Sequence, residues 1–330
     1  MNPETTDAVT ATDPPTETGT RPGPAPAPSP GPGHTPGSET PRPLPGEPAV
    51  AHASCGCGTD VSGEGGREAG GGTGAGYVYV LGRVHAVFPD LSVQHEFFQV
   101  AGADGATDAT DADALHRVLS DPENRYIARQ MCYVLSVQGV DTYILEPADP
   151  TDLDDIVEAL RPVDDRRDLA VVVGRLGPVA SPGVCQGLSV PVVRVEKIWA
   201  FDSKELIRAI DRPDDTPRKE FQRAAGALLD RLLQLGDNAG TEPVDRALNY
   251  LTVRDQEIYR KTHEKSTDGY ALSAVEAGPS RLSSGSHTVI TVVFSYTHRQ
   301  TNVTEQWFVR VGLAGLFPFR VTSLQPYYAR

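Results

Sequence analysis

The first 76 residues constrain the fold most, because they cannot contribute to a hydrophobic core. They contain 14 prolines and 16 glycines but no isoleucine and no aromatic residue. A segment of this composition buries too little apolar surface to offset the entropy lost on ordering. We therefore expect residues 1–76 to be a disordered tail, and residues 77–330 to supply a substantial core.

Charge and hydropathy exclude several classes of protein. The net charge is −14 at pH 7, and the sequence contains no cluster of lysine and arginine. We therefore expect no binding to nucleic acid or to an anionic membrane surface. The N-terminus "MNPETTDAVT" lacks the basic start and the apolar run of a secretory signal. No stretch reaches the roughly 18 consecutive apolar residues of a membrane span. These features predict a cytoplasmic protein with reduced cysteines.

The pattern of apolar residues predicts an α+β fold. Residues 77–88 form a β-rich run with a bend expected at Gly82. Three further β-rich runs follow, and amphipathic helical runs precede the first two of them. A helical block then precedes four short β-rich runs joined by turn residues. Because strands and helices do not alternate strictly, we expect a mixed sheet with helices, a central helical block and a C-terminal antiparallel β-meander. The break at "DRPDDTP" divides the folded part into two predicted domains, 77–212 and 213–330.

Residues 120–139 carry a strong local helix signal. Asp121 can cap the helix, and Pro122 occupies its first position. The apolar residues from Ile127 to Leu135 fall on one face, and Gly139 is suited to end the helix. We predict one helix over this span.

The four cysteines have different expected roles. Cys55 and Cys57 lie one residue apart, whereas cysteines that bind one zinc ion are usually separated by two to four residues. Because this spacing differs from that of common zinc sites, a plain linker element is the first interpretation of the pair. Zinc binding is the alternative hypothesis. We expect Cys132 to be a small buried residue beside the apolar helix face, and Cys185 to be exposed in a loop.

No recognisable catalytic motif is present. The sequence contains no GxSxG, no HExxH, no P-loop and no GxGxxG that follows a strand. We therefore assign no catalytic residue, name zinc as the one cofactor hypothesis, and favour a protein without catalytic activity.

Two groups of polar residues are candidates for binding a peptide or partner. Arg125 and Arg129 are four residues apart on the predicted helix, so they could form a carboxylate or peptide clamp. An intramolecular ion-pair network is the competing interpretation. Arg299, Asn302 and Glu305 surround a predicted hairpin tip, where polar residues either bind ligands or are simply solvated.

Long stretches of the sequence resemble a known family. They include "YVYVLGRVHAVFPDLSVQHEFFQ", "DNAGTEPVDRALNYLTVRDQEIY" and "VVFSYTHRQTNVTEQWFVRVGLAGLFPFRVTSLQPYY". The region 77–330 resembles the PatG domain and the PatG C-terminal domain of cyanobactin maturation proteases. In that family the pair commonly follows a subtilisin-like protease domain, and "SCGCGTD" resembles the linker that precedes the pair.

The resemblance implies a role in the maturation of ribosomally synthesised, post-translationally modified peptides. Because no subtilisin-like domain is recognised in this sequence, peptidase activity is not carried over. The leading hypothesis is a non-catalytic accessory module that recruits a precursor peptide or a stand-alone maturation protease. A free strand edge of the β-meander could accept such a peptide. The alternatives are a zinc- or thiol-dependent peptide-modifying enzyme that uses Cys185 or a bound zinc, and a structural module that forms a homodimer.

Overall fold

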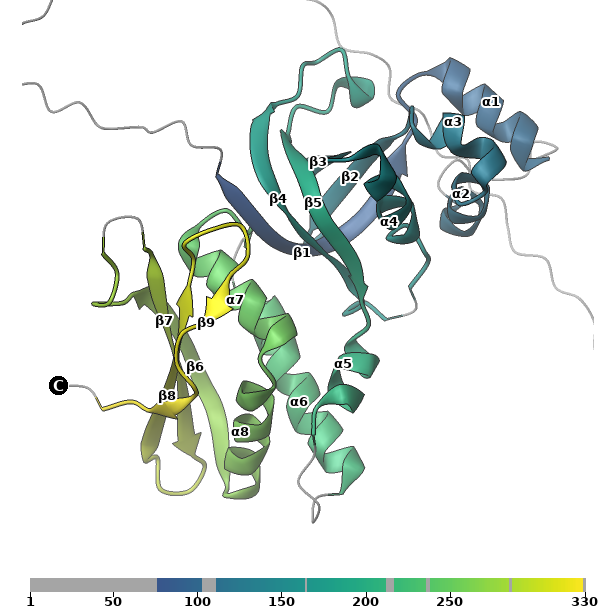
Figure 1. Cartoon of the computed structure of the whole chain (residues 1–330). Coiled ribbons are helices and arrows are strands. Elements are labelled where there is room, and N and C mark those ends of the chain that lie inside the picture. Colours follow the sequence, from purple (N-terminus) through teal and green to yellow (C-terminus); the bar gives the residue numbers. More distant parts are fainter. Residues whose placement is uncertain are drawn as a thin grey trace, which may run out of the picture. The chain divides into compact units, whose positions relative to one another are not determined.

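The structure confirms the α+β class, with two sheets and a set of helices (Figure 1). Residues 1–75 of the predicted tail, with the Cys55–Cys57 pair, lie outside the described residues. The computed structural model of the chain describes residues 76–102, 111–163, 165–211, 217–235, 238–284 and 287–328.

The first sheet closes into a five-stranded barrel. Its strands are β1 (Tyr77–Val87), β2 (Cys132–Val137), β3 (Val140–Pro147), β4 (Leu169–Val179) and β5 (Pro191–Phe201). Around the barrel the order is β1, β2, β3, β5 and β4, and every neighbouring pair is antiparallel except β3 and β5. The sequence predicted a mixed sheet but not its closure.

Strand β1 changes its hydrogen-bonding partner at the predicted bend. It pairs with β4 up to Gly82 and with β2 from Arg83 onwards. A Cβ atom at Gly82 would lie 2.5 Å from the carbonyl oxygen of Ser136. Only glycine fits this close approach without moving the backbone of β2.

Short helices accompany the barrel strands. They are α1 (Leu91–Ala101), α2 (Ala112–Leu119), α3 (Arg125–Ala128) and α4 (Leu153–Glu158), with 3-10 turns at Pro122–Asn124 and Pro150–Asp152. Asp90 and Asp111 cap α1 and α2 by accepting hydrogen bonds from backbone N–H groups of the first turn. The helices and the barrel interior share one apolar core, which includes Val80, Phe97, Leu119, Ile127, Ile156 and Val172.

The prediction of one helix over 120–139 is wrong in its second half. Asp121 caps a 3-10 turn, and the helix that follows ends at Ala128. Cys132–Val137 forms β2 instead, hydrogen-bonded to β1 on one side and to β3 on the other. A strand inside a barrel gains two rows of backbone hydrogen bonds, and these tertiary contacts outweigh the local helix signal.

A disulfide bond between Cys132 and Cys185 overturns the expectation of reduced thiols. Cys185 is also only 3% exposed, so the prediction of an exposed loop cysteine is wrong. The segment 180–190 folds back against the barrel, where the side-chain amide of Gln186 donates to the carbonyl of Phe88. Local sequence cannot reveal this contact because 53 positions separate the two cysteines.

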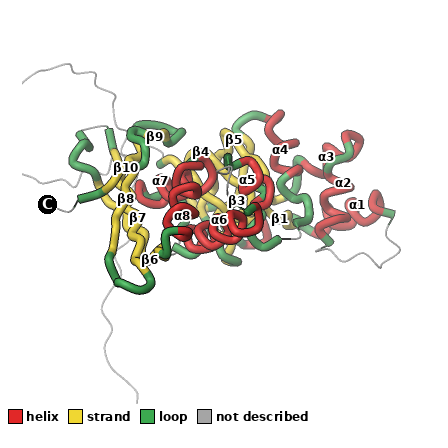
Figure 2. Tube along the Cα trace, turned by 90° about the horizontal axis from the view of Figure 1, so that it is seen from below, coloured by secondary structure: helices red, strands yellow, loops and turns green. Residues whose placement is uncertain are grey.

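The second half of the chain forms a helical layer and an antiparallel sheet. The helices are α5 (Ser203–Ala209), α6 (Arg218–Leu233), α7 (Pro243–Arg254) and α8 (Gln256–Thr267). The strands are β6 (Tyr270–Pro279), β7 (Val289–His298), β8 (Thr304–Gly312), β9 (Phe319–Arg320) and β10 (Gln325–Pro326). The order β10, β8, β7, β6 confirms the predicted meander, and the fourth predicted strand is two short pieces, β9 and β10, that both pair with β8. Figures 1 and 2 show α8 between α6 and this sheet.

A second core joins the helical layer to the barrel. Tyr79 and Leu81 on β1 pack with residues of α6, α7, α8, β7 and β8. The backbone N–H of Tyr79 donates to the carbonyl of Gly240, and the side-chain amide of Asn249 donates to the carbonyl of Tyr79. Both predicted domains therefore contribute to this core. Their division at residue 212 stays a prediction, because residues 212–216 lie outside the described part.

Removal of the disulfide should destabilise the fold. For the double variant Cys132→Ala, Cys185→Ala we expect the free energy of unfolding to fall by about 2–4 kcal/mol, because the bond closes a long loop. Urea unfolding followed by circular dichroism measures this difference. Dithiothreitol should destabilise the natural protein and leave the variant unchanged. An unchanged unfolding midpoint in the variant would contradict the bond.

The contact between Gly240 and β1 gives a second stability test. Gly240 has a φ of +70°, and a Cβ atom there would lie 2.4 Å from the carbonyl oxygen of Tyr79. Gly102 has a similar φ of +65°, but among the described residues no atom lies within 4 Å of such a Cβ. Gly240→Ala should therefore destabilise the protein by about 1–3 kcal/mol more than Gly102→Ala, which adds only backbone strain. Equal unfolding midpoints for the two variants would contradict this packing.

Candidate functional site

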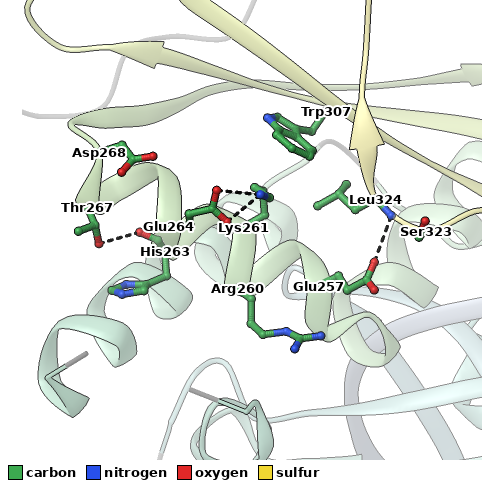
Figure 3. A pocket seen from close by; sticks show the side chains of 10 residues that line it. All are labelled: Glu257, Arg260, Lys261, His263, Glu264, Thr267, Asp268, Trp307, Ser323 and Leu324. Atoms are coloured by element: carbon green, nitrogen blue, oxygen red, sulfur yellow. Dashed lines mark hydrogen bonds and ion pairs between the residues drawn. The ribbon is translucent and has the colours of Figure 1, made fainter. Parts of the chain in front are cut away.

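An open groove lies between α8 and the end of the C-terminal sheet, and we call it the α8 groove. Its volume is about 560 Å³. Figure 3 shows its lining residues, most of which project from α8. They are Glu257, Arg260, Lys261, His263, Glu264, Thr267, Asp268, Trp307, Ser323 and Leu324.

Most charged side chains of the α8 groove are already paired with neighbours. The Nζ atom of Lys261 lies 2.7 and 2.8 Å from the two carboxylate oxygens of Glu264, one turn further along α8. Glu257 binds Arg320 at 2.9 Å and accepts a hydrogen bond from the backbone N–H of Leu324 at 3.1 Å. These pairs fix the shape of the groove and leave little net charge for a ligand to neutralise.

Trp307 supplies the aromatic surface of the α8 groove. The Nζ atom of Lys261 lies 3.9 Å from the centre of its ring, and Lys265 approaches it at 5.9 Å. These are cation–π contacts, which hold the ring in place. Trp307 is half-buried and lies beside Leu324 on the sheet side of the groove in Figure 3. The groove therefore combines an apolar patch with fixed polar walls.

Glu305 is anchored beside the α8 groove. The hydroxyl of Tyr270 donates to one of its oxygens at 2.7 Å, and Lys265 binds the other at 2.9 Å. The hydrogen bond from Tyr270, followed by that from Lys265, lowers the pKa of Glu305 below its ordinary value. Glu305 is therefore held as a charged residue that orients Lys265.

The α8 groove holds apart the one histidine and the one serine among its described lining residues. His263 and Ser323 lie at opposite ends of the groove in Figure 3, and the His263 ring contacts Phe221 edge-on at 5.2 Å. Within the described residues, no three histidine, cysteine or acidic side chains gather closely enough to hold a metal ion. Cys55 and Cys57, the predicted zinc ligands, lie outside those residues.

The two arginines predicted to form a clamp lie one helical turn apart, with the backbone N–H of Arg129 donating to the carbonyl of Arg125. Arg125 binds the carboxylate of Asp154 at 2.6 Å and the carbonyl of Pro150 at 3.2 Å, as the ion-pair interpretation predicted. Arg129 is exposed and lines a different cavity of about 650 Å³, beside the disulfide of Cys132. Arg125 does not line that cavity.

The three candidates at the hairpin tip also have different environments. Arg299 and Asn302 are exposed in the turn between β7 and β8. The backbone N–H of Arg299 donates to the carbonyl of Gly269, and Asn302 adopts a φ of +57° that helps to close the turn. Of the three, only Glu305 contacts an α8 side chain near Trp307. It pairs with Lys265, whose ammonium group lies 5.9 Å from the centre of the Trp307 ring.

The lining residues of α8 and Trp307 were not among the candidates predicted from the sequence. The sequence contains one signal for the position of Trp307. The alternation of side chains along β8 places it on the same face as Val309 and Val311. A run of exposed apolar residues at the end of the described chain was not predicted either. These are Phe317, Phe319, Val321, Tyr327 and Tyr328.

Two family models match the chain. The PatG Domain model matches residues 77–181, and the PatG C-terminal model matches residues 215–327. The chain belongs to the PatG-domain family. PatG domains are associated with cyanobactin maturation.

A solved structure supports the fold of this PatG-domain protein. The structure titled "PatG Domain of Unknown Function" superimposes with a TM-score of 0.62 and 18% sequence identity, over 77% of this chain and 99% of that chain. At this identity the similarity shows the fold alone. No curated protein matches the chain. Among the described helices, none has the length and apolar character needed to cross a lipid bilayer.

The lowered pKa of Glu305 predicts a pH-dependent contribution to stability. A carboxyl whose pKa is depressed in the folded state stabilises the protein above its ordinary pKa, and this contribution disappears as the pH falls through the folded value. When the pH is lowered from about 6 to 3, the free energy of unfolding should therefore fall less in Glu305→Gln than in the natural protein. The difference should be at most about 1 kcal/mol, because the ion pair is partly exposed.

Urea midpoints across that pH range test this expectation. Tyr270→Phe should produce part of the effect of Glu305→Gln, because it removes the hydrogen bond that lowers the pKa of Glu305 most. Glu276→Gln is the matched control, since Glu276 is exposed on β6 and has no ion pair within the described residues. A Glu305→Gln profile identical to that of the natural protein would contradict the prediction.

Proposed function

We propose that this PatG-domain protein is a binding module of cyanobactin-type peptide maturation, and that its α8 groove holds a segment of the precursor peptide. The observation that carries the proposal is Trp307, a half-buried indole on the wall of an open groove in which most charges are already paired. Indole rings are frequent anchors in protein interfaces, because they bury a large apolar area with little loss of entropy.

The walls of the α8 groove suit a peptide of mixed character. Trp307 and Leu324 offer apolar contact to one side chain of the peptide. Glu264 and Asp268 are partly exposed acceptors, and Arg260 has no ion pair within the described part of the chain. These groups can hydrogen-bond the polar backbone of an extended segment. Because the remaining charges are paired, binding does not require a strongly charged ligand.

The free edge of β6 is a weaker site for the same peptide. β6 is at the end of the sheet order, so one side of its backbone lacks a strand partner within the described residues. A register shift between Leu272 and Ala274 interrupts the strand, and Pro279 at its end has no N–H group. Bulges and prolines are the features that discourage the addition of a further strand.

The thiol-dependent alternative lacks its nucleophile in this structure. The Sγ atom of Cys185 is bonded to Cys132, and a disulfide sulfur is not a thiolate. Zinc binding by Cys55 and Cys57 stays a hypothesis, because both residues lie outside the described part.

Tryptophan fluorescence can test the proposal directly, because the chain has two tryptophans, Trp199 and Trp307. In a Trp199→Phe variant the emission of Trp307 should change saturably as the precursor peptide is added. In a Trp307→Phe variant the emission of Trp199 should stay constant. Calorimetry should show affinity at least about tenfold weaker for Trp307→Ala, as expected for an aromatic anchor.

A scrambled peptide of the same composition is the control ligand. An equal response to both peptides, or unchanged affinity in Trp307→Ala, would rule out specific binding in the α8 groove. A response to the maturation protease but not to the peptide would contradict peptide binding and indicate recruitment of the enzyme instead.

A further inference from the structure

A second cavity opens where β1 changes partner, and we call it the arginine pocket. Its volume is about 590 Å³. β1 leaves β4 after Gly82 and joins β2 at Arg83, so the walls come from this junction, from the turn after β2, and from α6 and α7. The volume is within the usual range for small-molecule sites.

The charged residues that line the arginine pocket are mostly positive. Among the described lining residues, three are arginines and one is a carboxylate, Asp230. The Nε atom of Arg167 donates to Asp230 at 2.8 Å. Arg83 makes one long contact, 3.5 Å from Nη2 to the carbonyl oxygen of Asp165, and Arg166 has no hydrogen bond or ion pair within the described part of the chain.

Two guanidinium groups therefore lack a described carboxylate partner in the same pocket. This concentration of positive charge is unusual for a chain with a net charge of −14. A guanidinium group offers a planar fork of N–H donors that matches the two oxygens of a carboxylate or a phosphate. An anionic group is thus the ligand that these arginines would recognise.

The arginine pocket also has apolar wall residues, beside the uncharged polar side chains of Ser136, Gln138, Gln234, Asn238 and Asn249. The apolar residues are Leu81, Val137, Leu169, Leu232 and Leu233. A small inorganic anion would leave these side chains without contacts, whereas an anion with an apolar body would bury them. The combination of cationic and apolar walls therefore selects an organic anion.

We propose that the arginine pocket binds an organic anion, namely a carboxylate or a phosphate monoester attached to an apolar group. Arg83 and Arg166 bind the charged oxygens, and Asp230 holds Arg167 against α6, where its Nη1 atom passes close to Gly226. This site is separate from the α8 groove, and the proposal does not depend on peptide binding there.

Calorimetry on the full chain at low salt can test the site with four probes. They are phenylacetate, phenyl phosphate, benzyl alcohol and inorganic phosphate. At least one aromatic anion should bind saturably, and the tighter of the two identifies the charged group. Benzyl alcohol lacks the charge and inorganic phosphate lacks the apolar body, so both should bind more weakly. The affinity for the aromatic anion should fall as salt is added.

Two sets of variants assign the binding to named residues. Arg83→Gln with Arg166→Gln should weaken binding at least about tenfold, because charge-assisted hydrogen bonds are lost. Asp230→Asn should strengthen it, because it removes the one carboxylate from the described lining. Arg117→Gln is the control, since Arg117 is exposed on α2 and does not line the pocket. Circular dichroism verifies that each variant is folded.

The proposal is overturned if neither aromatic anion binds, if inorganic phosphate binds as tightly as phenyl phosphate, or if the double arginine variant binds like the control. The Asp230→Asn variant also guards against a folding artefact, because a damaged fold would not increase affinity. None of these outcomes depends on Trp307, so this test and the fluorescence test can fail independently.

Discussion

The alternation of side chains along β1 connects the two halves of the fold. Val78 and Val80 point into the barrel core, whereas Tyr79 and Leu81 point into the second core with the helical layer. A strand that is buried on both faces must be apolar throughout, which explains the composition of this segment. The hydrogen bonds from Tyr79 and Asn249 add a polar connection at the same place. The helical layer, and the sheet packed on it, therefore depend on this strand.

The two cavities use charge in opposite ways. In the α8 groove, lysines and glutamates are paired with one another and hold an aromatic surface in position. In the arginine pocket, arginines outnumber carboxylates among the described lining residues. The first arrangement suits a large ligand that binds by shape and apolar contact, and the second suits a small ligand that carries its own charge. Under the two proposals, one chain holds two chemically different molecules on one scaffold.

Much of the fold could be predicted from local patterns. The strands from β1 to β8 other than β2, and the helices α5 to α8, coincide with apolar periodicity and with caps such as Asp255, which ends α7 and caps α8. β2 was predicted as a helix because Asp121 and Pro122 are a genuine start signal. That signal controls only one turn, and pairing with two neighbouring strands decides the conformation beyond it.

The sequence by itself determined that the region after residue 76 forms an α+β fold of the PatG-domain family, because apolar periodicity and long ordered strings are properties of the chain alone. Only the tertiary structure decided that the first sheet closes, that Cys132 meets Cys185, and that Arg83 and Arg166 share a pocket. Each of these facts joins residues dozens of positions apart. Such contacts depend on how strands pair and curve in space, and local sequence does not encode that geometry.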